Sequence, residues 1–429
     1  MRRLIGWVGR FATALLLRRI EVADRARFPT GRPVLVVANH FNGFVDPLVI
    51  ATALGRLPRF IAKDGLSRMP LAGFLLRRAG VVFVRRRVDH DGDVVNDDAF
   101  HECHQALVER DTVAIFPEGT THDRPRLDPI KTGAARIALG ARAAGAADLI
   151  ILPVGLTYPD KVALRPAALV QLGVPLELDD LIPAGIGADD QEAVRRLTDA
   201  IDGGLRGVSL DFPDIETSLA LEQAAHVALS DADDPDPSLA ERYALAGRLG
   251  RAPADHQAAV RREIGRYSTV LAGLRLTDAD IIHPTNPSRL LRSVIGLAVL
   301  VAILGGLVAA TAIVNLWPAA LVALVSLLVK APVSKGTARA VVGLVTFPTA
   351  WIAAGVIRAD GFLPVTLVAL TAAAGALAAV WLVDRAMALT HMLLRWQAQR
   401  ERIGTVAWAE AVRADVVGAV RTAAAVEAT

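Results

Sequence analysis

The 429-residue sequence contains one cysteine, Cys103, and few charged residues for its length. A single cysteine excludes an internal disulfide framework and any zinc or redox site built on a Cys-x-x-Cys pair, and it fits a reducing compartment. Charged residues make up 21% of the chain and hydrophobic residues 53%, which is too apolar for an ordinary soluble protein. We therefore expect part of the chain to lie in a membrane and its folded domain to face the cytosol.

Acidic residues are scarce near the N-terminus. The first 90 residues contain 17 Lys and Arg but 5 Asp and Glu, a net charge of +12, and the remainder contains 30 basic and 39 acidic residues, a net charge of −9. This asymmetry predicts an anionic partner for the first fifth of the chain. Nucleic acid is not expected, because the basic run Arg85–Arg87 has no interleaved aromatic residues. Lipid headgroups or a phosphate fit better.

The N-terminal segment lacks the small-residue cleavage pattern of a signal peptide, and Arg10 interrupts its apolar run. Apolar residues recur at helical spacing against arginines through the first 19 residues. This pattern is typical of an interfacial helix whose arginines face anionic headgroups. We interpret residues 1–30 as an amphipathic N-terminal membrane-interface helix; a helix docked on the next domain is the alternative.

Long uncharged stretches are confined to the chain after Arg292. Residues 293–329 are uncharged and are interrupted by Asn315 and Pro318, and two more uncharged stretches cover residues 340–357 and 361–383. Since one bilayer span needs about 20 residues, residues 289–384 are interpreted as a membrane region with about four spans, the first two separated by a turn at Asn315–Pro318.

Basic residues flank these stretches in a way that puts both ends of the membrane region in the cytosol. Residues 385–429 are then a cytosolic C-terminal helix, and the membrane is the inner membrane if the protein is bacterial. Re-entrant or interfacial second and third stretches are the alternative. No ionisable residue lies within the stretches, which favours an anchor over an ion pathway.

Short apolar runs alternate with helical stretches between residues 31 and 180. This alternation predicts an α/β domain with a mostly parallel sheet flanked by helices. Residues 181–288 lack strand signals and are interpreted as a helical appendage. The expected strands are Val34–Ala38, Phe60–Ala62, Val81–Val84, Val113–Phe116, Ile150–Leu156 and Leu169–Leu172, and the expected helices are Pro47–Leu54, Leu71–Arg78, Val94–Glu109 and Thr132–Ala144.

A histidine follows the first of these strands, at the edge where α/β sheets place their ligands. Asp46 comes six residues after His40, so the pair has the parts of a general base and the carboxylate that orients it. The pairing requires a turn at Asn42-Gly43, with Pro47 opening the next helix. A turn followed by a helix cap, without chemistry, is the alternative.

Four sequence blocks occur in a fixed order: His40 with Asp46, then Gly80–Arg86, Phe116–Gly119 and Ile151–Val154. In order and spacing they resemble the glycerolipid acyltransferase (PlsC-like, or lysophospholipid acyltransferase) superfamily. The His-Asp-Arg sequence after the Glu-Gly block and the apolar C-terminal stretches resemble its fungal-type glycerol-3-phosphate/dihydroxyacetone-phosphate acyltransferase branch. Most of the superfamily has four residues between the His and the Asp, whereas this chain has five, as in that branch.

The resemblance implies transfer of a fatty acyl group from an acyl thioester to a hydroxyl of glycerol-3-phosphate or dihydroxyacetone phosphate in phospholipid biosynthesis. The thioester would be acyl-CoA or an acyl carrier protein. His40 is then the catalytic base and Asp46 the residue that orients it. No enzyme nucleophile or cofactor is required, in agreement with the absence of a Gly-x-Ser-x-Gly elbow. The resemblance assigns acceptor binding to Arg86, Glu118 and Gly119, and the need for cations beside a phosphate adds Arg124 and Lys131.

Two other functions stay open at this point: acyl transfer to 1-acyl-glycerol-3-phosphate or another lysophospholipid, and lipid binding by a catalytically silent membrane protein. A metal site is not expected. His101 and His104 lack the spacing of a His-Glu-x-x-His zinc helix. The acidic run that begins at Asp89 has Phe100 where a calcium loop needs Glu.

Overall fold

The N-terminal half folds around a sheet, and the later residues are helical. This computed structural model describes residues 2–85, 96–160, 163, 165–231, 233–234, 236–282, 286–358, 360–401 and 403–426. The chain divides into two compact units. Unit 1 comprises Met1–Asp211 with Ala331–Thr337, and unit 2 comprises Phe212–Lys330 with Ala338–Thr429.

Unit 1 is built on an eight-stranded sheet with the order β1-β7-β6-β2-β5-β3-β4, and β8 pairs with β6. The neighbouring pairs among β2, β3, β4, β5 and β6 are parallel, and so is the pair of β1 with β7. Strand β6 pairs antiparallel with β7 and β8. The mostly parallel sheet is therefore confirmed. The strands are β1 (Arg19–Ala23), β2 (Val34–Ala38), β3 (Arg59–Lys63), β4 (Val82–Val84), β5 (Thr112–Ile115), β6 (Ile150–Thr157), β7 (Ala167–Leu172) and β8 (Leu176–Glu177).

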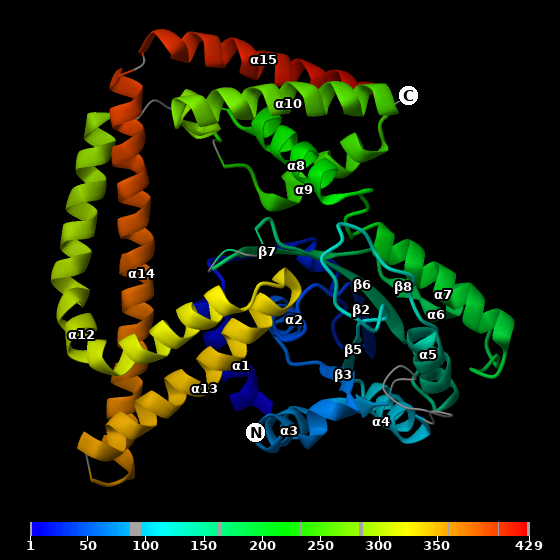
Figure 1. Ribbon diagram of the computed structural model, residues 1–429. Coiled ribbons are helices and arrows are strands. Elements are labelled where there is room, and N and C mark those ends of the chain that lie inside the picture. Colours follow the sequence, from blue (N-terminus) through cyan, green and yellow to red (C-terminus); the bar gives the residue numbers. More distant parts are fainter. Residues whose placement is uncertain are drawn as a thin grey trace. The chain divides into compact units, whose positions relative to one another are not determined.

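Helices cover both faces of this sheet (Figure 1). Helices α4, α5 and α7 bury their apolar side chains against Leu35, Val37 and Val113 on one face. Helix α1 packs on α2, which in turn packs on β1 and β7. Because β2 and β6 are covered on both sides, every residue in them is buried, which explains their continuous apolar sequences. The helices of unit 1 are α1 (Arg2–Leu16), α2 (Val45–Leu54), α3 (Pro70–Ala79), α4 (Asp97–Val108), α5 (Gly133–Ala143), α6 (Leu178–Leu181) and α7 (Gln191–Arg206), with short 3-10 turns at Arg25–Arg27 and Asp64–Arg68.

Strand β1 corrects the expected start of this domain. The N-terminal helix ends at Leu16, and Arg19–Ala23 then pairs in parallel with Ala167–Gln171. The sheet thus begins before residue 31. Arg165, just before β7, connects that strand to the end of the N-terminal helix: it donates to the backbone carbonyls of Ala14, Leu15 and Leu17. Strand β1 is a five-residue edge strand with no fully buried position, so its sequence lacks the apolar run that marks β2.

The described residues of unit 2 that have regular secondary structure are helical. Helices α8, α9, α10 and α15 pack together, and Arg413 of α15 binds Asp278 and the carbonyls of Val227 and Ser230. The expected appendage of residues 181–288 is divided between the units, because α7 buries Leu197 and Ile201 in the core of unit 1. The helices are α8 (Ile215–Leu229), α9 (Leu239–Arg251), α10 (Ala254–Leu274), α11 (Asp278–Ile282), α12 (Pro287–Leu328), α13 (Pro332–Arg358), α14 (Phe362–Glu401) and α15 (Ile403–Val426).

Three helices in the described part of the chain are long and apolar enough to cross a membrane: Pro287–Leu328, Ser334–Arg358 and Phe362–Gln397. The expectation of about four spans stays a prediction, because α12, with 42 residues, has about twice the length that one span needs. The turn expected at Asn315–Pro318 lies inside the single 42-residue helix α12. The side chain of Asn315 is buried: its amide donates to the carbonyl of Ala372 at 3.0 Å and its oxygen accepts from Trp351 at 2.8 Å. Figure 1 shows α12 as two arms that meet at a sharp bend, and Pro318, inside the helix, supplies a cause.

Candidate active site

The candidate site lies at the carboxyl ends of β2, β5 and β6, which are neighbours in the sheet. Asn39, the first residue after β2, is buried and binds both backbone groups of Leu156 in β6: its amide donates to the carbonyl at 2.9 Å, and its oxygen accepts from the N–H at 2.7 Å. These two hydrogen bonds join the ends of the two strands. It fixes the backbone from which His40 projects.

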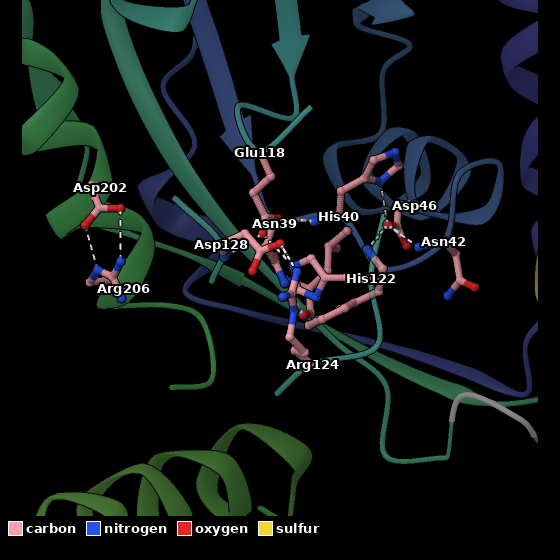
Figure 2. A network of polar contacts seen from close by, with 12 residues as sticks. Asn39, His40, Asn42, Asp46, Glu118, His122, Arg124, Asp128, Asp202 and Arg206 are labelled. Carbon is pink, nitrogen blue, oxygen red and sulfur yellow. Dashed lines mark hydrogen bonds and ion pairs between the residues drawn. The ribbon is translucent and has the colours of Figure 1, made fainter. Parts of the chain in front are cut away.

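His40 and Asp46 are in contact, as the sequence analysis requires (Figure 2). Nδ1 of His40 lies 2.9 Å from Oδ2 of Asp46, whose side chain is 0% exposed. The same oxygen accepts from the backbone N–H groups of Phe41 and Asn42, each at 2.7 Å. Asp46 belongs to the first turn of α2, and the N-cap of that helix is Phe44, without a side-chain cap. The aspartate therefore serves the histidine and the turn, not a helix cap.

The imidazole of His40 is held on a second side by aromatic packing. Its ring stacks on Phe116 with centroids 3.9 Å apart and an interplanar angle of 11°, and Phe60 stacks on Phe116 in turn. With Nδ1 donating to the carboxylate, Nε2 is the atom that accepts a proton. The side chain keeps 14% of its surface exposed. The ring is therefore held by two contacts and keeps part of its surface exposed.

Asp46 has one more donor, which the sequence analysis missed. The hydroxyl of Tyr158 donates to Oδ1 of Asp46 at 2.7 Å. Burial, and then the charge of Asp46, raise the pKa of Tyr158 well above its usual value, while the side chain of Asn42 acts in the opposite direction. Tyr158 directly follows β6. Its position at the carboxyl end of a strand beside β2 is the signal that would have found it.

Glu118 was expected to bind the acceptor, and the structure gives its carboxylate bonds within the protein. It is buried, and its Oε1 accepts from the backbone N–H of His40 at 2.9 Å. Its Oε2 accepts from the N–H of Asp128 at 2.8 Å and lies 2.6 Å from Nε2 of His122. The carboxylate thereby ties the loop after β5 to the end of β2, and this geometry favours a positioning role.

The other predicted acceptor residues lie in or near the same loop. Gly119 has a φ of +70°, and a Cβ there would lie 2.6 Å from Nζ of Lys131. The loop therefore needs glycine for its backbone conformation and for the close approach of the lysine. The half-exposed Arg124 forms an ion pair with Asp128 (Figure 2). Arg86 lies outside the described residues.

Glu118, His122 and Asp128 are close enough to share a metal ion, with ligand atoms within 4.8 Å of one another. Each of these groups already has a partner within the protein: His122 bonds to Glu118, and Asp128 forms an ion pair with Arg124. We interpret the cluster as a brace for the loop after β5. The contact between His122 and Glu118 was not predicted from the sequence, since it depends on how the loop turns back toward Glu118.

The turn between His40 and Asp46 also contacts the short part of unit 1 that comes from later in the chain. A Cβ on Gly336 would lie 2.8 Å from Oδ1 of Asn42, and a Cβ on Gly43 would lie 3.7 Å from Oγ1 of Thr337. Segment Ala331–Thr337 therefore forms part of the surroundings of the candidate base.

Residues 19–157 match the family model for the Acyltransferase family. This match shows that unit 1 contains an acyltransferase domain, and its sheet carries the candidate base, His40, at the carboxyl edge.

Among curated relatives, glycerol-3-phosphate O-acyltransferase 2 of Saccharomyces cerevisiae is 34% identical over 130 residues, 30% of this chain and 18% of the yeast protein. Lyso-ornithine lipid O-acyltransferase of Brucella abortus is 32% identical over 160 residues, 37% of this chain and 56% of that protein. The match thus spans only part of each relative. The crystal structure of the 1-acyl-sn-glycerophosphate acyltransferase PlsC from Thermotoga maritima is 23% identical, with a TM-score of 0.37, over 48% of this chain and 78% of that one.

Proposed function

We propose that the protein transfers a fatty acyl group from an acyl thioester to a hydroxyl of glycerol-3-phosphate or dihydroxyacetone phosphate. The observation that carries the proposal is the buried Asp46 carboxylate bonded to Nδ1 of a partly exposed His40. The acceptor is chosen because the yeast relative is named for glycerol-3-phosphate. A lyso-lipid acceptor is the second candidate: relatives are named for 1-acyl-sn-glycerol-3-phosphate and, with a longer match, for lyso-ornithine lipid.

The proposed reaction uses His40 as a base and then as an acid. Nε2 takes the proton of the acceptor hydroxyl. At the same time the hydroxyl oxygen attacks the thioester carbonyl and forms the new C–O bond. The tetrahedral intermediate then expels the sulfur, the C–S bond breaks, and the imidazolium returns its proton to the thiolate. Asp46 stabilises the imidazolium in between. A positioned base of this kind contributes about 10²- to 10⁴-fold to the rate.

Cations near the loop after β5 would bind the phosphate of the acceptor. Lys131 lies against Gly119, and Arg124 is half-exposed in the same loop; both are proposed as ligands of the acceptor phosphate. Arg86 is the third proposed phosphate ligand, by family resemblance. Acyl-CoA or an acyl carrier protein serves as co-substrate, and the scheme needs no cofactor.

The membrane provides the lipid side of the reaction. The three long apolar helices are proposed to anchor the protein, with unit 1 on the cytosolic side. Helix α1 adds an interfacial contact, since it exposes Leu4, Trp7 and Val8 together with Arg10. Apolar side chains beside arginine are suited to the boundary between headgroups and acyl chains. The acylated product would then form where it can enter the bilayer.

The test uses the full-length protein in detergent or nanodiscs with a radiolabelled acyl thioester. Acyl-CoA and acyl carrier protein are each combined with glycerol-3-phosphate, dihydroxyacetone phosphate, 1-acyl-glycerol-3-phosphate or lyso-ornithine lipid. We expect transfer to a phosphorylated three-carbon acceptor, reduced at least about 10²-fold in His40→Ala. The matched control is His101→Ala, at an exposed histidine outside the site. Equal transfer by wild type and His40→Ala refutes the mechanism. Preferential transfer to a lyso-lipid refutes the proposed acceptor and supports the second candidate.

A further inference from the structure

We propose that Tyr158 is a positioning residue for the catalytic base, acting on His40 through Asp46. The inference deepens the proposed function and rests on it. Tyr158 lies outside the four sequence blocks that define the resemblance.

The hydrogen bonds of Asp46 show what Tyr158 does. Oδ2 accepts three bonds, from Nδ1 of His40 and from the N–H groups of Phe41 and Asn42. Oδ1 accepts from the hydroxyl of Tyr158. Since Asp46 is fully buried, bulk water cannot take the place of a missing donor at Oδ1. The phenol therefore fixes the rotation of the carboxylate that aims Oδ2 at the imidazole.

The backbone places Tyr158 rigidly. It comes two residues after Leu156, which is bonded through both backbone groups to Asn39, the residue before His40. The end of β6 thus positions His40 through the backbone of Leu156, which binds Asn39, and positions Asp46 through the side chain of Tyr158. A phenol is suited to this task, because its raised pKa keeps the hydroxyl protonated, and so a donor, across the working pH range.

The bond also has an electrostatic consequence. A donor at Oδ1 draws part of the carboxylate charge away from Oδ2, so the imidazolium form of His40 is stabilised less. In the described part of the chain, the titratable groups bonded to Asp46 are His40 and Tyr158, and Glu118 accepts from the backbone N–H of His40. Removal of the hydroxyl should therefore favour imidazolium, and the neutral base should become available only at higher pH.

The experiment compares Tyr158→Phe with Tyr267→Phe in the full-length protein. Tyr267 is the matched control, because its hydroxyl also donates to an aspartate, Asp278, at 2.7 Å, but in unit 2. We expect Tyr158→Phe to lower kcat about tenfold, to change the KM for the acceptor little, and to move the acidic limb of the kcat/KM profile up by about half a pH unit. Tyr267→Phe should leave the profile unchanged. A Tyr158→Phe profile identical to that of wild type overturns the proposal.

A second measurement does not need activity. Diethyl pyrocarbonate modifies neutral imidazole, so the pH dependence of modification of the His40 peptide, followed by mass spectrometry, reports its titration directly. The midpoint should rise in Tyr158→Phe and stay in place in Tyr267→Phe; an unchanged midpoint refutes the coupling. If wild type transfers no acyl group to any acceptor but the midpoint shifts, the proposed function fails and the coupling stands.

Discussion

Replacing Asp46 by asparagine tests how the site holds its base. In the structure two backbone N–H groups, of Phe41 and Asn42, point at Oδ2, the oxygen that also faces His40. An amide nitrogen cannot occupy that position, because it would meet two donors. The asparagine oxygen must take it, and the NH₂ group then faces the hydroxyl of Tyr158, which can accept. His40 should therefore keep its Nδ1–H form in Asp46→Asn.

The size of the effect follows from this orientation. Asp46→Asn removes the charge but preserves the hydrogen bond to Nδ1, so the loss is the difference between a charge-assisted bond and a neutral one, about 1–2 kcal/mol. That difference corresponds to a decrease in kcat of roughly fivefold to thirtyfold. If the amide were turned the other way, the tautomer would reverse and the loss would approach the roughly 10⁴-fold seen when a serine protease loses the corresponding carboxylate.

The assay is acyl transfer at saturating acceptor for wild type, Asp46→Asn, His40→Ala and the double variant. Because Asp46 acts through the base, the double variant should be no slower than His40→Ala. A loss in Asp46→Asn as large as that in His40→Ala would refute the argument that the turn dictates the amide orientation. Wild-type activity in Asp46→Asn would refute the role of the charge.

Three further outcomes can be checked. Gly119→Ala should cost about 1–3 kcal/mol in the free energy of unfolding, because its φ is +70°, and should raise the KM for a phosphorylated acceptor by displacing Lys131; an unchanged KM would contradict that placement. Burial lowers the pKa of His104, so the unfolded chain binds a proton at this histidine before the folded chain does as pH falls below about 6.5. The melting temperature should therefore fall from pH 7 to 5, and it should fall less in His104→Leu. An equal fall of the melting temperature in both proteins would contradict the assignment. Burial raises the pKa of Cys103 to about 12, so iodoacetamide at pH 8 should label it only after unfolding.

The strands and the base were predictable because their signals are local. Strand β2 is apolar at every position since it is covered on both faces, and His40 follows it at the sheet edge where ligands bind. The histidine and aspartate could be paired because a six-residue turn limits where the two side chains can go. Strand β1 gave no such signal: it contains Arg19 and Glu21 and lies at the edge of the sheet.

Contacts that depend on strand order could not be read from the chain. Tyr158 reaches Asp46 because β6 lies next to β2, although the two residues are 112 positions apart. The bonds that Glu118 makes to His40 and His122 likewise need the folded loop. In the membrane region, Asn315 and Pro318 predicted a turn, whereas α12 stays helical across them and bends, and the contacts of Asn315 with Ala372 and Trp351 depend on the packing of neighbouring helices.

Unit 1 is discontinuous in sequence, and this affects how a catalytic fragment should be designed and how the domain matures. A fragment that ends at Asp211 would lack Ala331–Thr337, the segment beside Asn42 and Gly43. During synthesis, the turn that carries His40 and Asp46 obtains this neighbour only after all 42 residues of α12 have been made. Completion of the catalytic domain is therefore linked to prior synthesis of the first long apolar helix.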